Sequence, residues 1–225
     1  MTSTIECRAI LFDMDGTLVD STVVVELVWK RFADRFGLDL AEILETSHGR
    51  RMEDSIVRFG PDGIDVDAVK KDLSDFEYAT TDGIVAVAGA VDFIASLPAE
   101  SIALVTSAGR ELATMRMASV DVPLPGVVVT AEDVERGKPF PDPYLAAAAQ
   151  LGVDPADVVV FEDADAGIES GLAAGMRVIV VGDAAGAIGE GLPNIRDYAE
   201  IGASLEVPGD DESGDRRTRI VLTLA

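Results

Sequence analysis

The chain has 225 residues, of which 48% are hydrophobic, and its formal net charge is −23. This length suits one large domain or a domain with a sizeable insertion, and the negative charge disfavours nucleic acids and anionic membranes as partners. The single cysteine, Cys7, excludes an internal disulfide. No apolar stretch reaches the roughly 20 residues of a membrane span, and the N-terminus lacks the pattern of a secretion signal. We therefore expect a cytoplasmic protein.

The first predicted element is a short apolar strand, 9–12, which runs directly into the sequence DMDGT at 13–17. Asp13 and Asp15 stand two positions apart, so strand geometry places both carboxylates on one face. Two carboxylates this close repel each other unless a cation or a shared proton lies between them. The pair therefore predicts a metal ion and a reaction at the end of this strand.

A helical region without strands follows, from 23 to 81. Its first helix is predicted to end at Gly37, and it carries a stripe of apolar residues at helical spacing. The residues of the stripe are Val25, Trp29, Phe32 and Phe36. Further helices are predicted at 53–59 and 67–78, with a break in the pattern at 46–51.

Helices and strands then alternate. Helices are predicted at 90–97, 110–119, 143–151 and 166–174, and strands at 102–105, 127–129, 158–161 and 178–181. The strands are continuous runs of apolar residues, as is typical of a parallel sheet buried on both faces. We expect an α/β, Rossmann-like fold, a charged mobile loop at 209–217 and an edge strand at 219–224.

Polar residues stand where several of these strands end. Thr106 follows one strand, Glu162 and Asp163 follow another, and Lys138 lies in the loop sequence GKPFPDPY. Each acidic residue or threonine alone fits a helix cap equally well. In open α/β sheets, however, ligands bind outside the carboxyl ends of the strands. Together with the first pair of aspartates, these residues predict one polar site.

Four segments carry a resemblance to a known family: DMDGTLVDS, LVTS, GKPFPDPY and FEDADAGIESGLAAGM. In order and spacing they resemble the four motifs of haloacid dehalogenase-like hydrolases, over roughly 8–182 of the chain. The resemblance implies a catalytic core at 1–21 and 83–225 with a small all-helical cap, 22–82, inserted after the first strand. Within this family the chain looks most similar to the sugar-phosphate and polyol-phosphate phosphatases, including the 2-deoxyglucose-6-phosphate and glycerol-phosphate enzymes.

The resemblance also implies a mechanism. Asp13 would attack phosphorus and form an aspartyl-phosphate, and Asp15 would act as general acid and then as general base. A Mg²⁺ ion would be held by Asp13, the main-chain carbonyl of Asp15 and Asp163, with Glu162 as a direct or water-mediated ligand.

The same resemblance assigns phosphate binding to three residues of the core. Thr106, Ser107 and Lys138 would hold the phosphoryl oxygens and offset their charge. Together with the metal ion, Lys138 would supply a local positive site in a strongly acidic protein.

Substrate selection is expected in the cap. His48 is the only histidine, which excludes histidine-based triads and multi-histidine metal sites. His48, Gly49, Arg50 and Arg51 fall where the family's substrate-recognition loop lies, although a solvated basic turn remains the alternative. Arg51 aligns with a recurring arginine of the sugar and polyol phosphatases and is expected to contact substrate. Asp54 either binds a hydroxyl group or pairs with a neighbouring arginine.

These features predict hydrolysis of a small phosphorylated sugar or polyol by a monomeric enzyme. The leading alternative is a phosphosugar mutase of the beta-phosphoglucomutase type. Mutase relatives carry a cap histidine about ten residues past the acid/base aspartate, where this chain has Val25, so hydrolysis is favoured. A module that binds phosphometabolites and a phosphoprotein phosphatase are further, less favoured alternatives.

Overall fold

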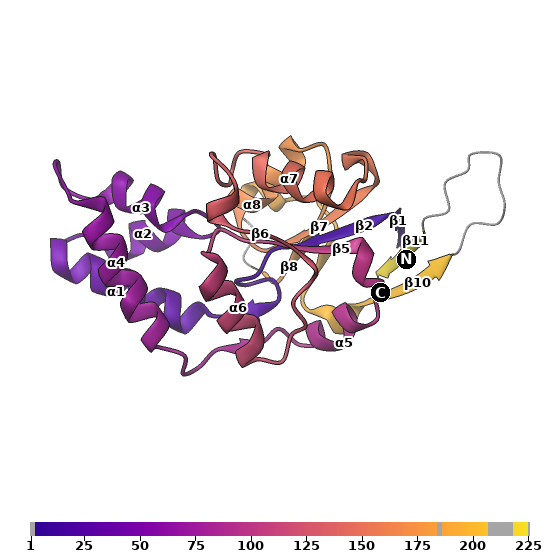
Figure 1. Cartoon of the computed structure of the whole chain (residues 1–225), viewed down its shortest axis with the longest axis horizontal. Helices are drawn as coiled ribbons and strands as arrows, with labels where there is room; N and C mark the ends of the chain where they lie inside the picture. The colour runs from indigo at the N-terminus through magenta and orange to yellow at the C-terminus, as the bar shows by residue number, and fades with distance from the viewer. Residues whose placement is uncertain (1–2, 184–185, 207–217, 225) are drawn as a thin grey trace.

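A computed structural model describes residues 3–183, 186–206 and 218–224. Its centre is a six-stranded sheet in the order β6-β5-β2-β7-β8-β9, in which every neighbouring pair is parallel (Figure 1). In chain order its strands are β2 (Ala9–Phe12), β5 (Ile102–Val105), β6 (Val127–Val129), β7 (Val158–Glu162), β8 (Arg177–Val181) and β9 (Asn194–Ile195). The sheet confirms the predicted α/β class.

Helices cover both faces of this sheet. They are α5 (Ala90–Ala95) and α6 (Arg110–Ser119) on one face, and α7 (Asp142–Leu151) and α8 (Asp165–Ala173) on the other. Because side chains alternate along a strand, Ile10 and Phe12 pack into the first layer, and Ala9 and Leu11 pack into the second. All four side chains are fully buried, which explains the uninterrupted apolar sequence of β2.

The helical cap lies apart from the sheet, at the left of Figure 1. Its helices are α1 (Thr22–Phe36), α2 (Leu40–Ser47), α3 (Met52–Phe59) and α4 (Val66–Ala79). They are inserted between β3 (Val19–Asp20) and β4 (Val85–Ala86), two short strands that pair antiparallel. The cap has its own apolar core, centred on Trp29 and Phe32. Helix α1 ends at Gly37 in the left-handed conformation, φ 68°, as predicted, whereas α2 was not predicted.

The strand predicted at 219–224 is present, but its predicted position at an edge is wrong. Strand β11 (Arg219–Leu224) is the central strand of a separate three-stranded antiparallel sheet, between β1 (Ser3–Cys7) and β10 (Ile201–Glu206). Every second residue of β11 is buried, because one face of this sheet packs on the core. The loop expected at 209–217 lies outside the described residues.

No helix within the described ranges has the length and apolar character that a membrane crossing requires.

Candidate active site

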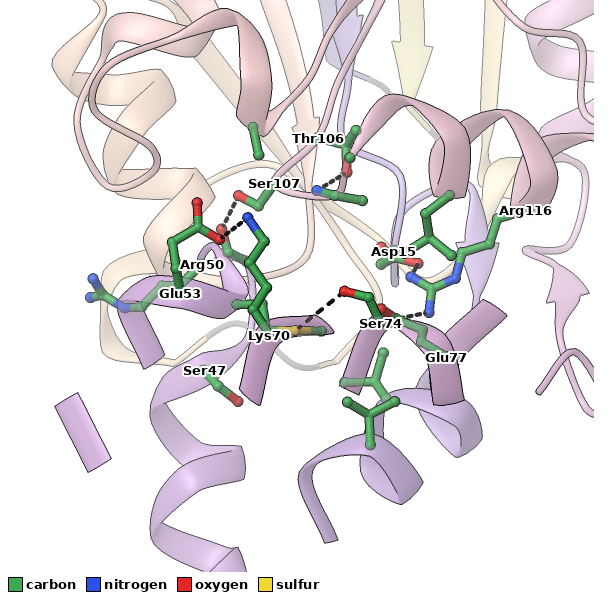
Figure 2. A pocket seen from close by; sticks show the side chains of 18 of the residues that line it. Asp15, Ser47, Arg50, Glu53, Lys70, Ser74, Glu77, Thr106, Ser107 and Arg116 are labelled. Carbon is green, nitrogen blue, oxygen red and sulfur yellow. Dashed lines mark hydrogen bonds and ion pairs between the residues drawn. The ribbon is translucent and has the colours of Figure 1, made fainter. Parts of the chain in front are cut away.

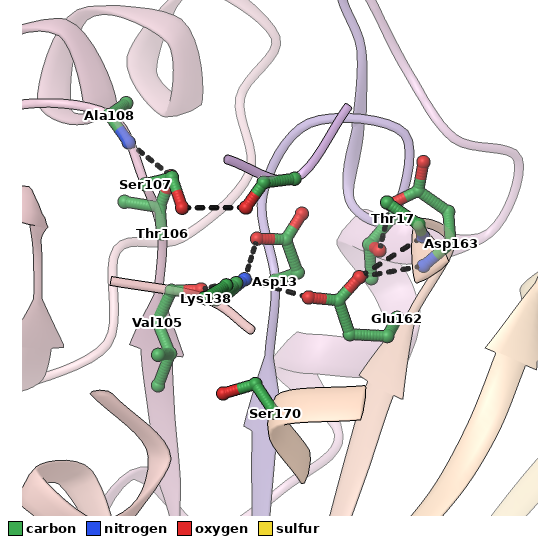
Figure 3. Close-up of polar contacts among 12 residues, drawn as sticks. Asp13, Thr17, Val105, Thr106, Ser107, Ala108, Lys138, Glu162, Asp163 and Ser170 are labelled. Atoms are coloured by element: carbon green, nitrogen blue, oxygen red, sulfur yellow. Dashed lines mark hydrogen bonds and ion pairs between the residues drawn. The ribbon is translucent and has the colours of Figure 1, made fainter. Parts of the chain in front are cut away.

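The carboxyl ends of three neighbouring strands carry the polar residues that the sequence singled out. Asp13 follows β2, Thr106 follows β5, Glu162 is the last residue of β7 and Asp163 follows it. Because β5, β2 and β7 are adjacent and parallel, their ends meet at one edge of the sheet. Figure 3 shows these side chains gathered at that edge.

Lys138 occupies the centre of this group. Its side chain is 1% exposed, and its Nζ atom donates to Asp13 Oδ1, to Glu162 Oε1 at 2.7 Å and to the Val105 carbonyl at 3.0 Å (Figure 3). An ammonium group has three protons, and these contacts use all of them. Burial lowers the pKa of Lys138, but the Asp13 and Glu162 carboxylates outweigh this effect, so its pKa lies above the usual value. The lysine is therefore a permanent cation.

The acidic side chains of the group outnumber this cation. Burial raises the pKa of Asp13 to about 7, where the charge of Lys138 opposes the rise and that of Glu162 adds to it. Burial, followed by the charges of Glu162 and Asp13, raises the pKa of Asp163 well above its usual value. Each of these three carboxyl groups places one oxygen within 4.8 Å of the others. An all-oxygen set of this kind fits a hard divalent cation such as Mg²⁺.

Glu162 is already fully hydrogen-bonded. Its Oε1 accepts from Lys138 Nζ and from Tyr144 Oη at 2.8 Å, and its Oε2 accepts from the backbone N–H groups of Asp163 at 3.0 Å and Ala164 at 3.2 Å. A carboxylate has about four acceptor positions, so these contacts fill its capacity. They fit an indirect contact with a metal ion better than direct ligation, which stays a prediction.

Two glycines make room for the acidic side chains. A Cβ atom on Gly16, whose φ is +83°, would lie 2.0 Å from Asp163 Oδ2, and one on Gly167 would lie 1.6 Å from Glu162 Oε1. Contacts this short are impossible between non-bonded atoms. The chain therefore approaches both carboxylates as closely as only glycine permits.

A cavity of about 230 Å³ lies beside this group, between the strand ends and the cap (Figure 2). From the core it is lined by Asp13, Asp15, Thr106 and Ser107, and from the cap by His48, Gly49 and Arg50, among others. Asp15 also lines a second cavity of about 1010 Å³, which reaches Asp163. Four core residues predicted to act on phosphate and three cap residues predicted to select substrate thus face a common space, whereas buried Lys138 does not line either cavity.

The loop at 48–50 is tied to the core at this cavity. Ser107 Oγ donates to the Gly49 carbonyl at 2.8 Å, so a residue predicted to bind phosphate also contacts the cap. Burial lowers the pKa of His48, although Glu26 and Asp15 oppose the shift. The shift favours the neutral form of the His48 imidazole.

Neither Arg51 nor Asp54 is among the described residues that line the two cavities. Arg51 Nε and Nη2 donate to the two carboxylate oxygens of Asp54 at 2.8 and 3.0 Å, and Nη1 donates to the Glu135 carbonyl at 3.1 Å. Asp54 thus pairs with an arginine, one of the two alternatives for it, and Arg51 connects cap to core. Their contact with substrate stays a prediction.

Sequence reasoning missed two charged residues at Asp15. Arg116, on α6, donates to Asp15 Oδ1 at 2.8 Å and to Glu77 Oε1, on α4, at 2.7 Å (Figure 2). The sequence held a signal, because Glu77 stands four residues after the apolar Leu73 and Arg116 stands four residues after the apolar Leu112. Charges on the apolar face of two helices indicate partners elsewhere in the fold.

Comparisons with known proteins agree with this geometry. A family model described as haloacid dehalogenase-like hydrolase matches 10–181. Hexitol phosphatase A of Escherichia coli is 44% identical over 179 residues, which cover 78% of this chain and 83% of that protein. Glycerol-1-phosphate phosphohydrolase 2 of Saccharomyces cerevisiae is 36% identical over 186 residues, which cover 78% and 74%. A Bacteroides vulgatus structure, provisionally assigned as a beta-phosphoglucomutase, matches with a TM-score of 0.69 at 28% identity, covering 85% and 84%.

Proposed function

Because the chain belongs to the haloacid dehalogenase-like hydrolases, we propose that it is a Mg²⁺-dependent phosphatase of a small sugar or polyol phosphate. The relatives at 44% and 36% identity are named as a hexitol phosphatase and as a glycerol-1-phosphate phosphohydrolase. The observation that carries the proposal is the buried cluster in which Lys138 contacts Asp13 and Glu162 beside Asp163. It combines a nucleophile, a fixed cation and oxygen ligands for a metal.

The proposed reaction has two steps. The Asp13 carboxylate forms a bond to phosphorus while the bond from phosphorus to the alcohol oxygen breaks, and protonated Asp15 gives its proton to that oxygen. The alcohol leaves, and Asp13 carries the phosphoryl group. Ionised Asp15 then takes a proton from the water that attacks phosphorus, and the bond between phosphorus and the Asp13 oxygen breaks. Phosphate is released, Asp13 is again a carboxylate and Asp15 is again protonated.

Asp13, Asp163 and the main-chain carbonyl of Asp15 would hold the metal ion. When bound, Mg²⁺ supplies positive charge that offsets the charge of the transferring phosphoryl group. Lys138 supplies a second, permanent positive charge at the nucleophile, and Glu162 holds its amine in place. Stabilisation of this kind is the main part of catalysis in phosphoryl transfer.

We assign the core to 1–21 and 83–225 and the cap to 22–82. The pairing of β3 with β4 supports this division, because these two strands are the segments where the chain leaves the core for the cap and returns to it. His48, Gly49 and Arg50 are the proposed contacts to the sugar or polyol, since they line the cavity at Asp15. A monomeric state and a cytoplasmic location complete the proposal.

Phosphate release tests the function. Purified protein is incubated with Mg²⁺ and a panel of three- to six-carbon sugar and polyol phosphates, beside an Asp13→Asn variant. We expect the wild-type protein to release phosphate from at least one member and Asp13→Asn to release none above background, because an amide cannot form the aspartyl-phosphate. Equal release by both proteins would contradict the assignment of the nucleophile.

A phosphosugar mutase is the second candidate, favoured by the match to the Bacteroides vulgatus structure. The same panel separates the two reactions, since a mutase accumulates an isomeric phosphosugar and a phosphatase accumulates free phosphate. A binding module would need no acid/base group, so an Asp15→Asn variant that keeps full biological activity would favour binding over catalysis.

A further inference from the structure

Asp15 is held by a buried bridge that begins in the cap. Arg116 Nη2 donates to Glu77 Oε1 at 2.7 Å, and Arg116 Nη1 donates to Asp15 Oδ1 at 2.8 Å (Figure 2). Glu77 belongs to α4 in the cap, and Arg116 belongs to α6 in the core. We propose that Arg116 and Glu77 are positioning residues that aim Asp15 Oδ2 at the leaving-group oxygen while the cap is docked. The inference rests on the proposed phosphatase function.

The hydrogen bonds distinguish the two oxygens of Asp15. Oδ1 accepts from Arg116 and also from Ser21 Oγ at 2.6 Å, which occupies both of its lone pairs. Within the described ranges, no residue donates a hydrogen bond to Oδ2. The side chain of Asp15 is 28% exposed and lines the cavity. Oδ2 is therefore the oxygen that is left to carry a proton to the alcohol.

Stability does not account for this bridge. Arg116 is 2% exposed and Glu77 7%, and burying such an ion pair often stabilises a fold no more than apolar residues of equal size. In addition, Arg116 Nε is buried without a hydrogen-bond partner among the described residues, which is itself unfavourable. Arg116 therefore occupies a position that costs stability, as expected of a residue with a role in the reaction.

The bridge also requires an arginine. A guanidinium group is a rigid fork that donates in two directions, whereas a lysine amine is a single point charge on a flexible stem. Because one branch contacts the cap and the other contacts Asp15, the orientation of Asp15 depends on the position of α4. Substrate enclosure by the cap and alignment of the acid are thereby coupled.

Leaving-group dependence tests the proposal. The kcat/KM of wild type, Arg116→Met, Arg116→Lys and Glu77→Gln is measured with glycerol 1-phosphate, with sorbitol 6-phosphate and with p-nitrophenyl phosphate. An alkoxide needs a proton to leave and nitrophenolate does not, so misdirecting Asp15 harms only the alkyl substrates. We expect kcat/KM for the alkyl phosphates to fall about 100-fold in the Arg116 variants, the lower range of general acid catalysis. For p-nitrophenyl phosphate the change should stay within about threefold, because kcat/KM reports the steps up to phosphoryl transfer.

The matched control is Arg110→Met on the same helix, because Arg110 pairs with Asp133 at 2.8 Å and donates to the Val128 carbonyl, and not to Asp15 or Glu77. It should change kcat/KM for all three substrates equally and little. An equal loss for alkyl and aryl substrates in the Arg116 variants, or no loss in either, would overturn the proposal. If Arg116→Met does not fold, Arg116→Lys and Glu77→Gln decide by the same criterion. A wild-type protein that hydrolyses none of the substrates would instead overturn the proposed function.

Discussion

At the scale of single residues, the charge balance of the acidic cluster is its most informative property. Asp13, Glu162 and Asp163 lie together, and within the described part of the chain Lys138 is the cation that contacts this cluster through Asp13 and Glu162. Burial raises the pKa of Asp13 and of Asp163, and the neighbouring carboxylates add to the rise. A divalent cation would relieve this repulsion, so the unbalanced charge supports the proposed magnesium site.

Gly16 allows a test of this site without changing a charged group. Gly16→Ala should push Asp163 away from Asp13, because the added Cβ would lie 2.0 Å from Asp163 Oδ2. We expect phosphate release to fall strongly and the Mg²⁺ concentration for half-maximal activity to rise at least about tenfold, within the range for disturbed metal contacts. Titration of activity with Mg²⁺ provides the measurement.

The matched control is Gly63→Ala. Gly63 has a similar φ of +77°, but nothing lies within 4 Å of the Cβ it would gain. The Gly63→Ala variant should be destabilised by about 1 kcal/mol, because alanine is strained at a positive φ, and its Mg²⁺ dependence should be unchanged. If both variants showed the same Mg²⁺ dependence, Gly16 would matter for its backbone conformation alone.

At the scale of elements, the cap is a small helical unit with its own core. Phe32 of α1 is fully buried there, and the centroid of its ring lies 5.9 Å from the centroid of the Trp29 ring in an edge-on arrangement. Trp29 is the only tryptophan of the chain, so its fluorescence reports on the cap and not on the sheet. The two parts of the molecule are therefore separable by spectroscopy.

Phe32→Ala should destabilise the cap by about 3–5 kcal/mol, the usual result of removing a buried aromatic ring. We expect the Trp29 fluorescence transition in urea to move to a lower midpoint. Leu27→Ala is the control, because Leu27 lies on the same helix with 41% of its surface exposed, and it should change the midpoint little. Equal shifts in the two variants would contradict the packing of α1 described above.

At the scale of the whole molecule, the charge of −23 opposes the approach of a phosphorylated substrate. Lys138 is buried, so it acts at close range and cannot attract a substrate from solution. Repulsion from the rest of the surface remains at longer distances. The field of the molecule and the chemistry of its site therefore have opposite effects on a phosphate group.

Salt should separate these effects. Repulsion between exposed charges is screened over about 10 Å at 0.1 M ionic strength, so we expect kcat/KM for a sugar or polyol phosphate to rise severalfold from about 0.01 to 0.2 M NaCl at saturating Mg²⁺. A series in sucrose of matched osmolarity should not show this rise. A steady fall of kcat/KM with salt would mean that attraction by local positive charge controls substrate approach.

The sequence alone was sufficient to predict the parallel sheet, the inserted helical cap without its second helix, α2, and the group at Asp13, Lys138, Glu162 and Asp163. The strands follow from apolar runs of strand length, the helices from apolar residues at helical spacing, and Asp13, Glu162 and Asp163 from polar residues where such a run ends. Lys138 was singled out by its loop sequence, GKPFPDPY. Parallel strands then bring their carboxyl ends to one edge, so residues far apart in the chain become neighbours without further information.

Only the tertiary structure decided how Glu77 meets Arg116, where Arg51 lies and which strand pairs with β11. These contacts depend on how the cap docks on the core and how the two ends of the chain meet. Local periodicity shows that a charge stands on an apolar helix face, but it does not identify the partner, because that partner belongs to an element packed from another part of the sequence. Asp13, the proposed nucleophile, could thus be recognised from its motif, whereas Arg116 and Glu77, which we propose to orient Asp15, required the folded molecule.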